Sequence, residues 1–315
     1  MRIILMILLF SSLLFSEENK GSMFSSMIEA SVDLTKVDLL INKDNALDKK
    51  LAQTIKGQHA ETQIIEKVNK NSIIDLLTQE DDLRMGIISE ASLRYANNKD
   101  KSIESKIKRL LPLYEELIYV FVLVDSNISF LDDLKGKRVA MGKKDTNAWH
   151  VGKVLKEEHG ISWSEDNASL SSKEDLIQAS FRLLTNKLDA FIYVGNPQNN
   201  LIEKHFQSNT GKKLKLIEIK SENFYTKEIE KEKHQWLDAH SKKILYSKAL
   251  LVVHNFFFIK GKTERINKRY EQVIKKIKRA SAKQIKKKFN IDSRTQTKWE
   301  KWLDGSQISY KELIK

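Results

Sequence analysis

Short apolar runs alternate along the chain with longer stretches in which apolar residues recur at helical spacing. The runs that have the length and composition of strands are Val37–Asn42, Thr62–Val68, Arg84–Ser89, Leu117–Val124, Arg138–Gly142, Asp189–Val194, Lys213–Ile219 and Lys248–Asn255. The predicted helices are Ala46–Lys56, Ser72–Gln79, Asn147–Glu158, Lys173–Asn186 and Thr263–Phe289. Because apolar strands separated by helices are typical of βαβ units around a buried, largely parallel sheet, the pattern predicts an α/β fold.

A proline and a glycine-containing loop divide this pattern into two lobes. The chain has 315 residues, enough for one large domain or two of moderate size. Pro112 stands just before the long apolar run Leu117–Val124, where we expect the chain to cross from one lobe to the other. The strand pattern resumes at Lys213–Ile219, after the loop NTGKK, where we expect the chain to return. The predicted first lobe comprises residues 17–120 and 215–315, and the second comprises residues 121–214.

Residues 1–16 have the pattern of a secretory signal peptide. Arg2 is followed by a mostly apolar run from Ile3 to Phe15 and then by polar residues. A helix of that length spans about 20 Å, which is shorter than the roughly 30 Å hydrocarbon core of a bilayer. We therefore expect export to the periplasm. An uncleaved anchor stays open, because Leu14 is unfavourable three residues before the expected cleavage point, and so does a buried N-terminal helix.

The positive charge of the chain is concentrated near its C-terminus. The formal net charge is +13, and residues 260–290 hold thirteen Lys or Arg against Glu264 and Glu271, which gives +11 for that segment. The remainder is close to neutral, which argues against a nucleic-acid partner. Apolar residues at helical spacing within Lys260–Asn290 predict a helix packed on the first lobe with a solvated basic face. The alternative is contact with an anionic membrane surface or an acidic partner.

Patterns typical of catalytic sites do not occur in the sequence. It has no G-x-S-x-G, H-E-x-x-H or G-x-x-x-x-G-K-[ST] motif, and its seven histidines are scattered. The absence of cysteine excludes disulfides, thiolate metal sites and a cysteine nucleophile. We therefore expect a protein that is not an enzyme and that needs neither a cofactor nor a metal.

Polar residues where predicted strands lead into helices are the candidates for a binding site. Ligands of α/β sheets collect at the carboxyl ends of strands, where helix N-termini present unpaired N–H groups. In the turn after Arg138–Gly142, Thr146 and Asn147 can donate hydrogen bonds to an anion, and Trp149 offers a flat wall with an indole donor. Each junction can also be an ordinary helix cap. The candidate ligand-binding residues are Asn45, Asn71, Ser72, Ser89, Glu90, Thr146, Asn147, Trp149, Tyr193 and Asn196.

Three stretches, taken together and in order, resemble TRAP-associated extracytoplasmic immunogenic (TAXI) solute-binding proteins. They are NSIIDLLTQEDDLRMGIISEASL (71–93), LYEELIYVFVLVDSNISFLDDLKGKRVAMGKKDTNAW (113–149) and KLDAFIYVGNPQNNLI (187–202). The D-L-K-G-K-R-V-A-x-G element within them is shared with other two-lobed binding proteins. The chain departs from the TAXI pattern in NKDNALDKK (42–50), where that family has a glycine-rich turn with a tyrosine, and in KDTNAW (144–149), where it has a Gly-Ser-Gly-Thr-like turn.

The resemblance implies the type II periplasmic-binding-protein fold, with two α/β lobes, hinge strands and a central ligand cleft. It also implies that the protein captures a small organic anion, a carboxylate or an acidic amino acid, for a TRAP-type membrane permease, and we expect a monomer. Two alternatives stay open: a ligand-sensing or scaffold module of the same fold that is not coupled to transport, and a periplasmic enzyme, for which the sequence offers no hydrolytic constellation.

Overall fold

The computed structural model describes residues 37–254, apart from 44, 59, 68–69, 79–83, 171, 196–203, 206–207 and 229–242, together with residues 272 and 275. The predicted signal peptide lies outside these ranges, and so does nearly all of the predicted C-terminal basic helix. None of the helices within the described ranges is long and apolar enough to cross a bilayer.

The first lobe contains the βαβ units that the alternating pattern predicts. Its elements are β1 (Val37–Asn42), α3 (Ala46–Gln58), β2 (Thr62–Lys67), α4 (Lys70–Leu77), β3 (Arg84–Ser89), α5 (Glu90–Lys99) and α6 (Ile103–Lys106). Strand β1 pairs in parallel with both β2 and β3. Most residues of β1 and β3 are buried, as is typical of parallel strands that are covered on both faces.

The second lobe has a sheet between two helices. Its elements are β5 (Arg138–Ala140), α7 (Asn147–His159), β6 (Ser164–Asp166), α8 (Lys173–Leu184), β7 (Ala190–Gly195) and β8 (Leu214–Leu216), with short 3-10 turns at Leu131–Leu134 and Gly211–Lys213. Strand β5 pairs in parallel with β6 and β7. Apolar residues of α7 and of α8 belong to separate core clusters, so each helix packs on its own part of the core.

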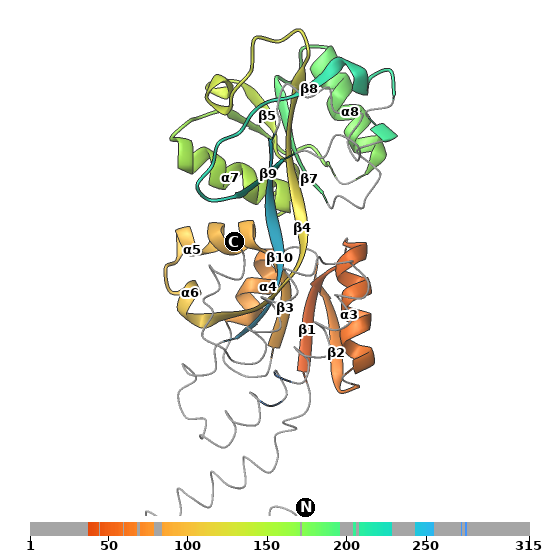
Figure 1. Cartoon of the computed structure of the whole chain (residues 1–315), viewed down its shortest axis with the longest axis vertical. Helices are drawn as coiled ribbons and strands as arrows, with labels where there is room; N and C mark the ends of the chain where they lie inside the picture. Colours follow the sequence, from red (N-terminus) through yellow and green to blue (C-terminus); the bar gives the residue numbers. More distant parts are fainter. Residues whose placement is uncertain are drawn as a thin grey trace, which may run out of the picture.

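Two long antiparallel strands, β4 (Ile107–Leu123) and β10 (Lys243–His254), run through both lobes (Figure 1). Strand β10 pairs with β3 in the first lobe, and β4 pairs with β7 in the second. The result is one mixed sheet in the order β2-β1-β3-β10-β4-β7-β5-β6, with β8 on β4 and β9 (Tyr225–Glu228) on β10. The predicted fold, an α/β protein of two lobes joined by hinge strands, is confirmed.

The crossings differ in detail from those that the sequence predicts. Strand β4 begins at Ile107, so Pro112 lies inside the strand and does not precede it. Proline cannot donate a ladder hydrogen bond, and the β4–β10 register shifts at this point, between Ala249 and Leu250. The chain returns through β10, whereas the predicted return segment Lys213–Ile219 contains β8, which pairs with β4.

Helix α7 packs so closely on its lobe that Gly152 has no room for a side chain. A Cβ there would lie 3.0 Å from Met141 Cγ and 3.4 Å from Ile192 Cδ1. Overpacking costs about 1–3 kcal/mol, which exceeds the roughly 1 kcal/mol that alanine gains over glycine in a helix. We expect Gly152→Ala to lower the free energy of unfolding by about 1–2 kcal/mol in urea titrations. The matched change Gly57→Ala, in α3 and in open space, should instead raise it by about 0.5 kcal/mol. Equal stability of the two variants would contradict this packing.

Candidate functional site

The two long strands carry polar residues where they pass between the lobes. The pairing of β10 with β3 ends at Ala249, opposite Ser89, and the pairing of β4 with β7 begins at Leu117, opposite Gly195. Two rungs of the β4–β10 ladder lie between these points, and we call them the crossing. They pair Glu116 with Ser247 and Glu115 with Lys248.

Lys248 is a buried cation at the crossing. Its side chain is only 9% exposed, and Nζ lies 4.3 Å from the ring centroid of Tyr225 and 5.8 Å from that of Tyr246. Burial lowers the pKa of Lys248 to about 8, although the negative charges of Glu90 and Glu115 act in the opposite direction. Its ammonium group thus rests on two aromatic rings in place of an ion pair with a described carboxylate.

Glu90 is a buried anion near this lysine. It is 2% exposed and is the first residue of α5, directly after the N-cap Ser89. Its Oε1 accepts hydrogen bonds from Tyr225 Oη and from Arg94 Nη2, each at 3.2 Å. Its Oε2 is buried and has no hydrogen-bond partner among the residues that the structure describes. Burial, together with the charge of Glu90, raises the pKa of Tyr225, so its hydroxyl stays a donor.

A second polar group joins the crossing to the start of α7. Asn147, the first residue of that helix, donates its side-chain amide to Glu116 Oε1. Its Oδ1 and the hydroxyl of Ser247 are buried without a hydrogen-bond partner in the described part of the chain. Unsatisfied buried groups of this kind are rare in proteins and call for an explanation, such as a water molecule or a ligand.

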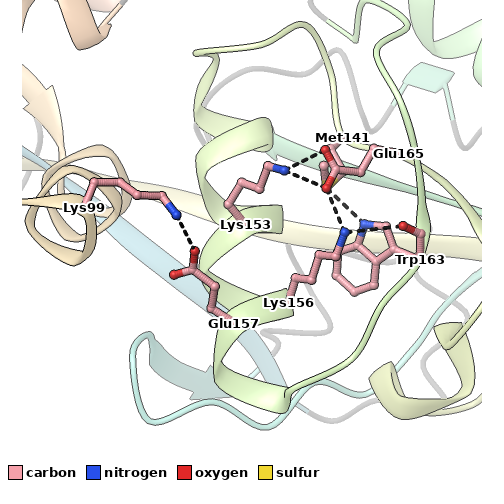
Figure 2. Close-up of polar contacts among 7 residues, drawn as sticks. All are labelled: Lys99, Met141, Lys153, Lys156, Glu157, Trp163 and Glu165. Atoms are coloured by element: carbon pink, nitrogen blue, oxygen red, sulfur yellow. Dashed lines mark hydrogen bonds and ion pairs between the residues drawn. The ribbon is translucent and has the colours of Figure 1, made fainter.

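Helices α5 and α7 bring the two lobes together with their N-terminal ends side by side. Near those ends, Ser92 Oγ and His150 Nδ1 form a buried hydrogen bond of 2.9 Å, and Tyr95 meets Trp149 edge to face at 5.0 Å between centroids. Near the other ends, Lys99 on α5 forms an ion pair of 3.2 Å with Glu157 on α7, as Figure 2 shows. Two parallel helix N-termini therefore meet beside the crossing, and their dipoles favour negative charge there.

The opposite side of α7 is fastened to its own lobe. Lys153 and Lys156 both bind Glu165 on β6, with Nζ–Oε1 distances of 2.6 and 2.8 Å, and Trp163 donates its indole N–H to Met141 Sδ at 3.3 Å (Figure 2). These lysine contacts lower the pKa of Glu165 against the raising effect of its burial. Helix α7 is thus anchored to its own lobe, and its N-terminus lies against the start of α5 in the other lobe.

Three of the residues predicted from the sequence are helix caps. Asn45 Oδ1 accepts from the backbone N–H groups that begin α3, and its Nδ2 donates to Tyr114 Oη at 2.8 Å. Ser89 caps α5 by accepting from Ala91 N. Thr146 caps α7, accepting from Trp149 N at 3.4 Å, and its hydroxyl donates to Lys143 O at 2.7 Å.

The other predicted residues are dispersed. Glu90 and Asn147 lie at the adjoining helix N-termini beside the crossing. Trp149 and Tyr193 are both 6% exposed but belong to different core clusters of the second lobe. Asn71 and Ser72 lie in the first turn of α4, which begins at Lys70, and their side chains are outside the described part of the structure. Asn196 is also outside it.

Sequence reasoning missed the residues at the centre of the site, although part of the signal was present. The doublets Glu115–Glu116 and Ser247–Lys248 are polar interruptions in two otherwise apolar strands, LLPLYEELIYVFVL and ILYSKALLVV. A polar doublet inside a long apolar strand indicates that the strand leaves one hydrophobic core there and enters another. The sequence around Tyr225 gave no comparable signal, because its strand has only four residues and the other three, Thr226 to Glu228, are polar.

Within the described residues, no three His, Asp or Glu side chains are grouped so that they could hold a metal ion. Two serine–histidine pairs occur in the part of the chain that the structure describes, Ser92 with His150 and Ser180 with His205 at 2.7 Å. All four side chains are buried, with exposures of 0–1%. A serine nucleophile has to reach its substrate, so this burial favours a structural role for both pairs.

Several solved structures are similar in fold. They include XAC2383 from Xanthomonas citri bound to chloride ion (13% identity, 86% of this chain and 97% of that chain covered, TM-score 0.47). AbpA from Streptococcus pneumoniae, an amino acid ABC transporter substrate-binding protein bound to L-arginine, matches with 14% identity, coverages of 91% and 99%, and a TM-score of 0.43. ArtJ from Geobacillus stearothermophilus, an arginine-, lysine-, histidine-binding protein, matches with 16% identity, coverages of 89% and 100%, and a TM-score of 0.44. Identities and TM-scores this low assign no ligand to this chain.

No curated protein matches the sequence significantly. The NMT1-like family matches residues 46–250, which include the second lobe, the crossing and most of the first lobe other than β1 and the end of β10. This match covers well over half of the chain, and the chain belongs to the NMT1-like family.

Proposed function

We propose that this chain is an exported solute-binding protein that holds a small organic anion between its lobes. The observation that carries the proposal is Lys248, a buried ammonium group that rests on tyrosine rings at the crossing. Burying an ammonium group without an ion pair destabilises a fold, and the lowered pKa of Lys248 is a direct expression of that penalty. A ligand carboxylate would supply the missing partner.

The surroundings of Lys248 support binding of an anion at this place. The N-termini of α5 and α7 lie side by side there and favour negative charge within the first helical turn, a preference that the carboxylate of Glu90 meets in part. Tyr225 and Tyr246 provide flat apolar surfaces beside the ammonium group. A carboxylate or an acidic amino acid has the charge for such a site, whereas a neutral sugar has no anionic group that could form an ion pair with the lysine.

The connection between the lobes supports a binding cycle without chemistry. The lobes share β4 and β10, and α5 of the first lobe packs on α7 of the second. Closure about hinge strands around a solute is a common mechanism of binding proteins. We infer delivery to a TRAP-type permease from the TAXI resemblance, and export from the signal-peptide pattern of residues 1–16.

A thermal-shift screen of organic acids, amino acids and neutral sugars tests this proposal. A ligand that binds the native state at one hundred times its Kd stabilises it by about 2.7 kcal/mol. For a chain of this size we expect the best organic acid or amino acid to raise Tm by roughly 5 °C or more, and sugars to leave it unchanged. Stabilisation by a sugar alone would contradict the proposal.

A further inference from the structure

We infer that the solute carries a protonated amine beside its carboxylate, and that Glu90 binds the amine while Lys248 binds the carboxylate. This inference rests on the proposed function, because it assumes that the solute occupies the crossing. It narrows the solute from an organic anion to an amino acid or a close analogue in which both charges are present.

The balance of hydrogen-bond donors and acceptors beside the crossing favours a ligand with a protonated amine. Glu90 Oε2 and Asn147 Oδ1 are acceptors that are buried and have no hydrogen-bond partner among the described residues. A simple carboxylate has only acceptors and can satisfy neither of them. A protonated amine has three N–H donors and no acceptor, which is the complement of these oxygens.

The two opposite charges, Glu90 and Lys248, are arranged on either side of one tyrosine. Tyr225 connects them, because its hydroxyl donates to Glu90 Oε1 at 3.2 Å while its ring centroid lies 4.3 Å from Lys248 Nζ. Glu90 and Lys248 therefore flank one tyrosine ring without forming an ion pair with each other. A zwitterion presents a cation and an anion a few bonds apart, and it can pair with both side chains without adding net charge to a buried site.

The competing explanation is that Glu90 has a structural role alone. It lies in the first turn of α5, where a carboxylate interacts favourably with the helix dipole, and its Oε1 binds Arg94 and Tyr225. These contacts account for Oε1 and for the negative charge. They do not account for the burial of Oε2 without a described partner, which the amine explains.

Matched ligand pairs distinguish the two explanations in the unaltered protein. We would titrate the full chain calorimetrically at pH 7 with L-alanine and pyruvate, L-leucine and 4-methyl-2-oxopentanoate, and L-glutamate and 2-oxoglutarate. A thermal-shift survey of the twenty amino acids would identify any amino acid that binds more tightly than these three. That amino acid and the oxo acid derived from it would then be titrated in the same way. We expect at least one amino acid to bind about 10- to 100-fold more tightly than its oxo acid, as is typical of losing a hydrogen bond to a charged group.

The outcomes separate this inference from the proposed function. If the oxo acids bind as tightly as the amino acids in every pair, the inference is overturned and the organic-anion function stands. If neither class binds, both are overturned.

The variant Glu90→Gln tests the role of the carboxylate itself. Glutamine keeps the shape of the side chain and an oxygen that can accept from Tyr225 and Arg94. We expect it to weaken binding of the preferred amino acid about 10-fold or more and to change the affinity of its oxo acid by less than about twofold. The matched control is Glu174→Gln, an exposed carboxylate in the first turn of α8, which should change neither affinity. Unchanged amino-acid binding by a folded Glu90→Gln protein would overturn the assignment of Glu90.

Discussion

Replacing Lys248 with methionine is expected to stabilise the fold and to remove its affinity for organic anions. The pKa of Lys248 is lowered to about 8 by burial, and each tenfold change in a protonation constant corresponds to about 1.4 kcal/mol. Holding the lysine charged therefore costs the folded state about 3 kcal/mol at pH 7. The cation–π contact between Lys248 and the Tyr225 ring offsets about 1 kcal/mol of this desolvation penalty. We expect Lys248→Met to raise the free energy of unfolding by about 2 kcal/mol in urea titrations.

The pH dependence gives this prediction a second readout. The pKa of Lys248 is lower in the folded state than in the unfolded chain, so the unfolded state binds more protons between about pH 8 and pH 10.4. The penalty is complete below pH 8 and disappears as the pH rises through that window. The stability advantage of Lys248→Met should therefore shrink from pH 7 to pH 10, and the anion affinity of the wild-type protein should fall over the same range.

Lys215→Met is the matched control for this substitution, because Lys215 lies on β8 in the second lobe and donates to Ser126 O at 2.7 Å. It should leave anion affinity unchanged. A Lys248→Met protein that binds the ligand normally would show that the lysine is not part of the site. Loss of stability at pH 7 would show that Lys248 is structural.

Trp149→Ala is expected to give the largest loss of stability. Trp149 is 6% exposed, meets Tyr95 of α5 edge to face, and has Lys153 Nζ 5.0 Å from its ring centroid. Truncating a buried tryptophan typically costs about 3–5 kcal/mol. We expect a loss of that size in urea titrations, because the substitution opens a cavity at the junction of the lobes.

Trp149→Phe is the matched variant, since it keeps an aromatic ring against Tyr95 and should cost less than half as much. The alternative from the sequence, that Trp149 forms a wall of the ligand site, makes a different prediction. In that case Trp149→Ala would weaken ligand binding while changing the free energy of unfolding by less than about 1 kcal/mol, which is the usual range for residues outside the core. That result would contradict the packing role that its burial indicates.

The regular part of the fold could be predicted because its physical signal is local. Strands β1 and β3 have the predicted bounds, since each is a short apolar run between polar stretches. Helix α7 begins at the predicted residue because Thr146 supplies a cap and Gly142, with φ of 81°, the sharp turn before it.

The parts that sequence reasoning missed depend on contacts between distant segments. Helix α5 was not predicted, because EASLRYANNK is mostly polar, and it is held by packing against α7 and by the cap Ser89. Strand β4 extends further than predicted because β10 accommodates Pro112 with a register shift. The position of Lys248 beside Tyr225 and Glu90 depends on three separate elements, so no single stretch of sequence could reveal it.

Hydrogen exchange measured by mass spectrometry tests the central claim, that the solute binds at the crossing between the lobes. The full chain would be compared with and without a saturating amount of the compound that most raises its Tm. We expect slower exchange in peptides that contain the starts of α5 and α7 and the crossing rungs of β4 and β10, with little change in α8. Protection confined to α8 or to the outer strands β2 and β6, with none at the crossing, would contradict the account.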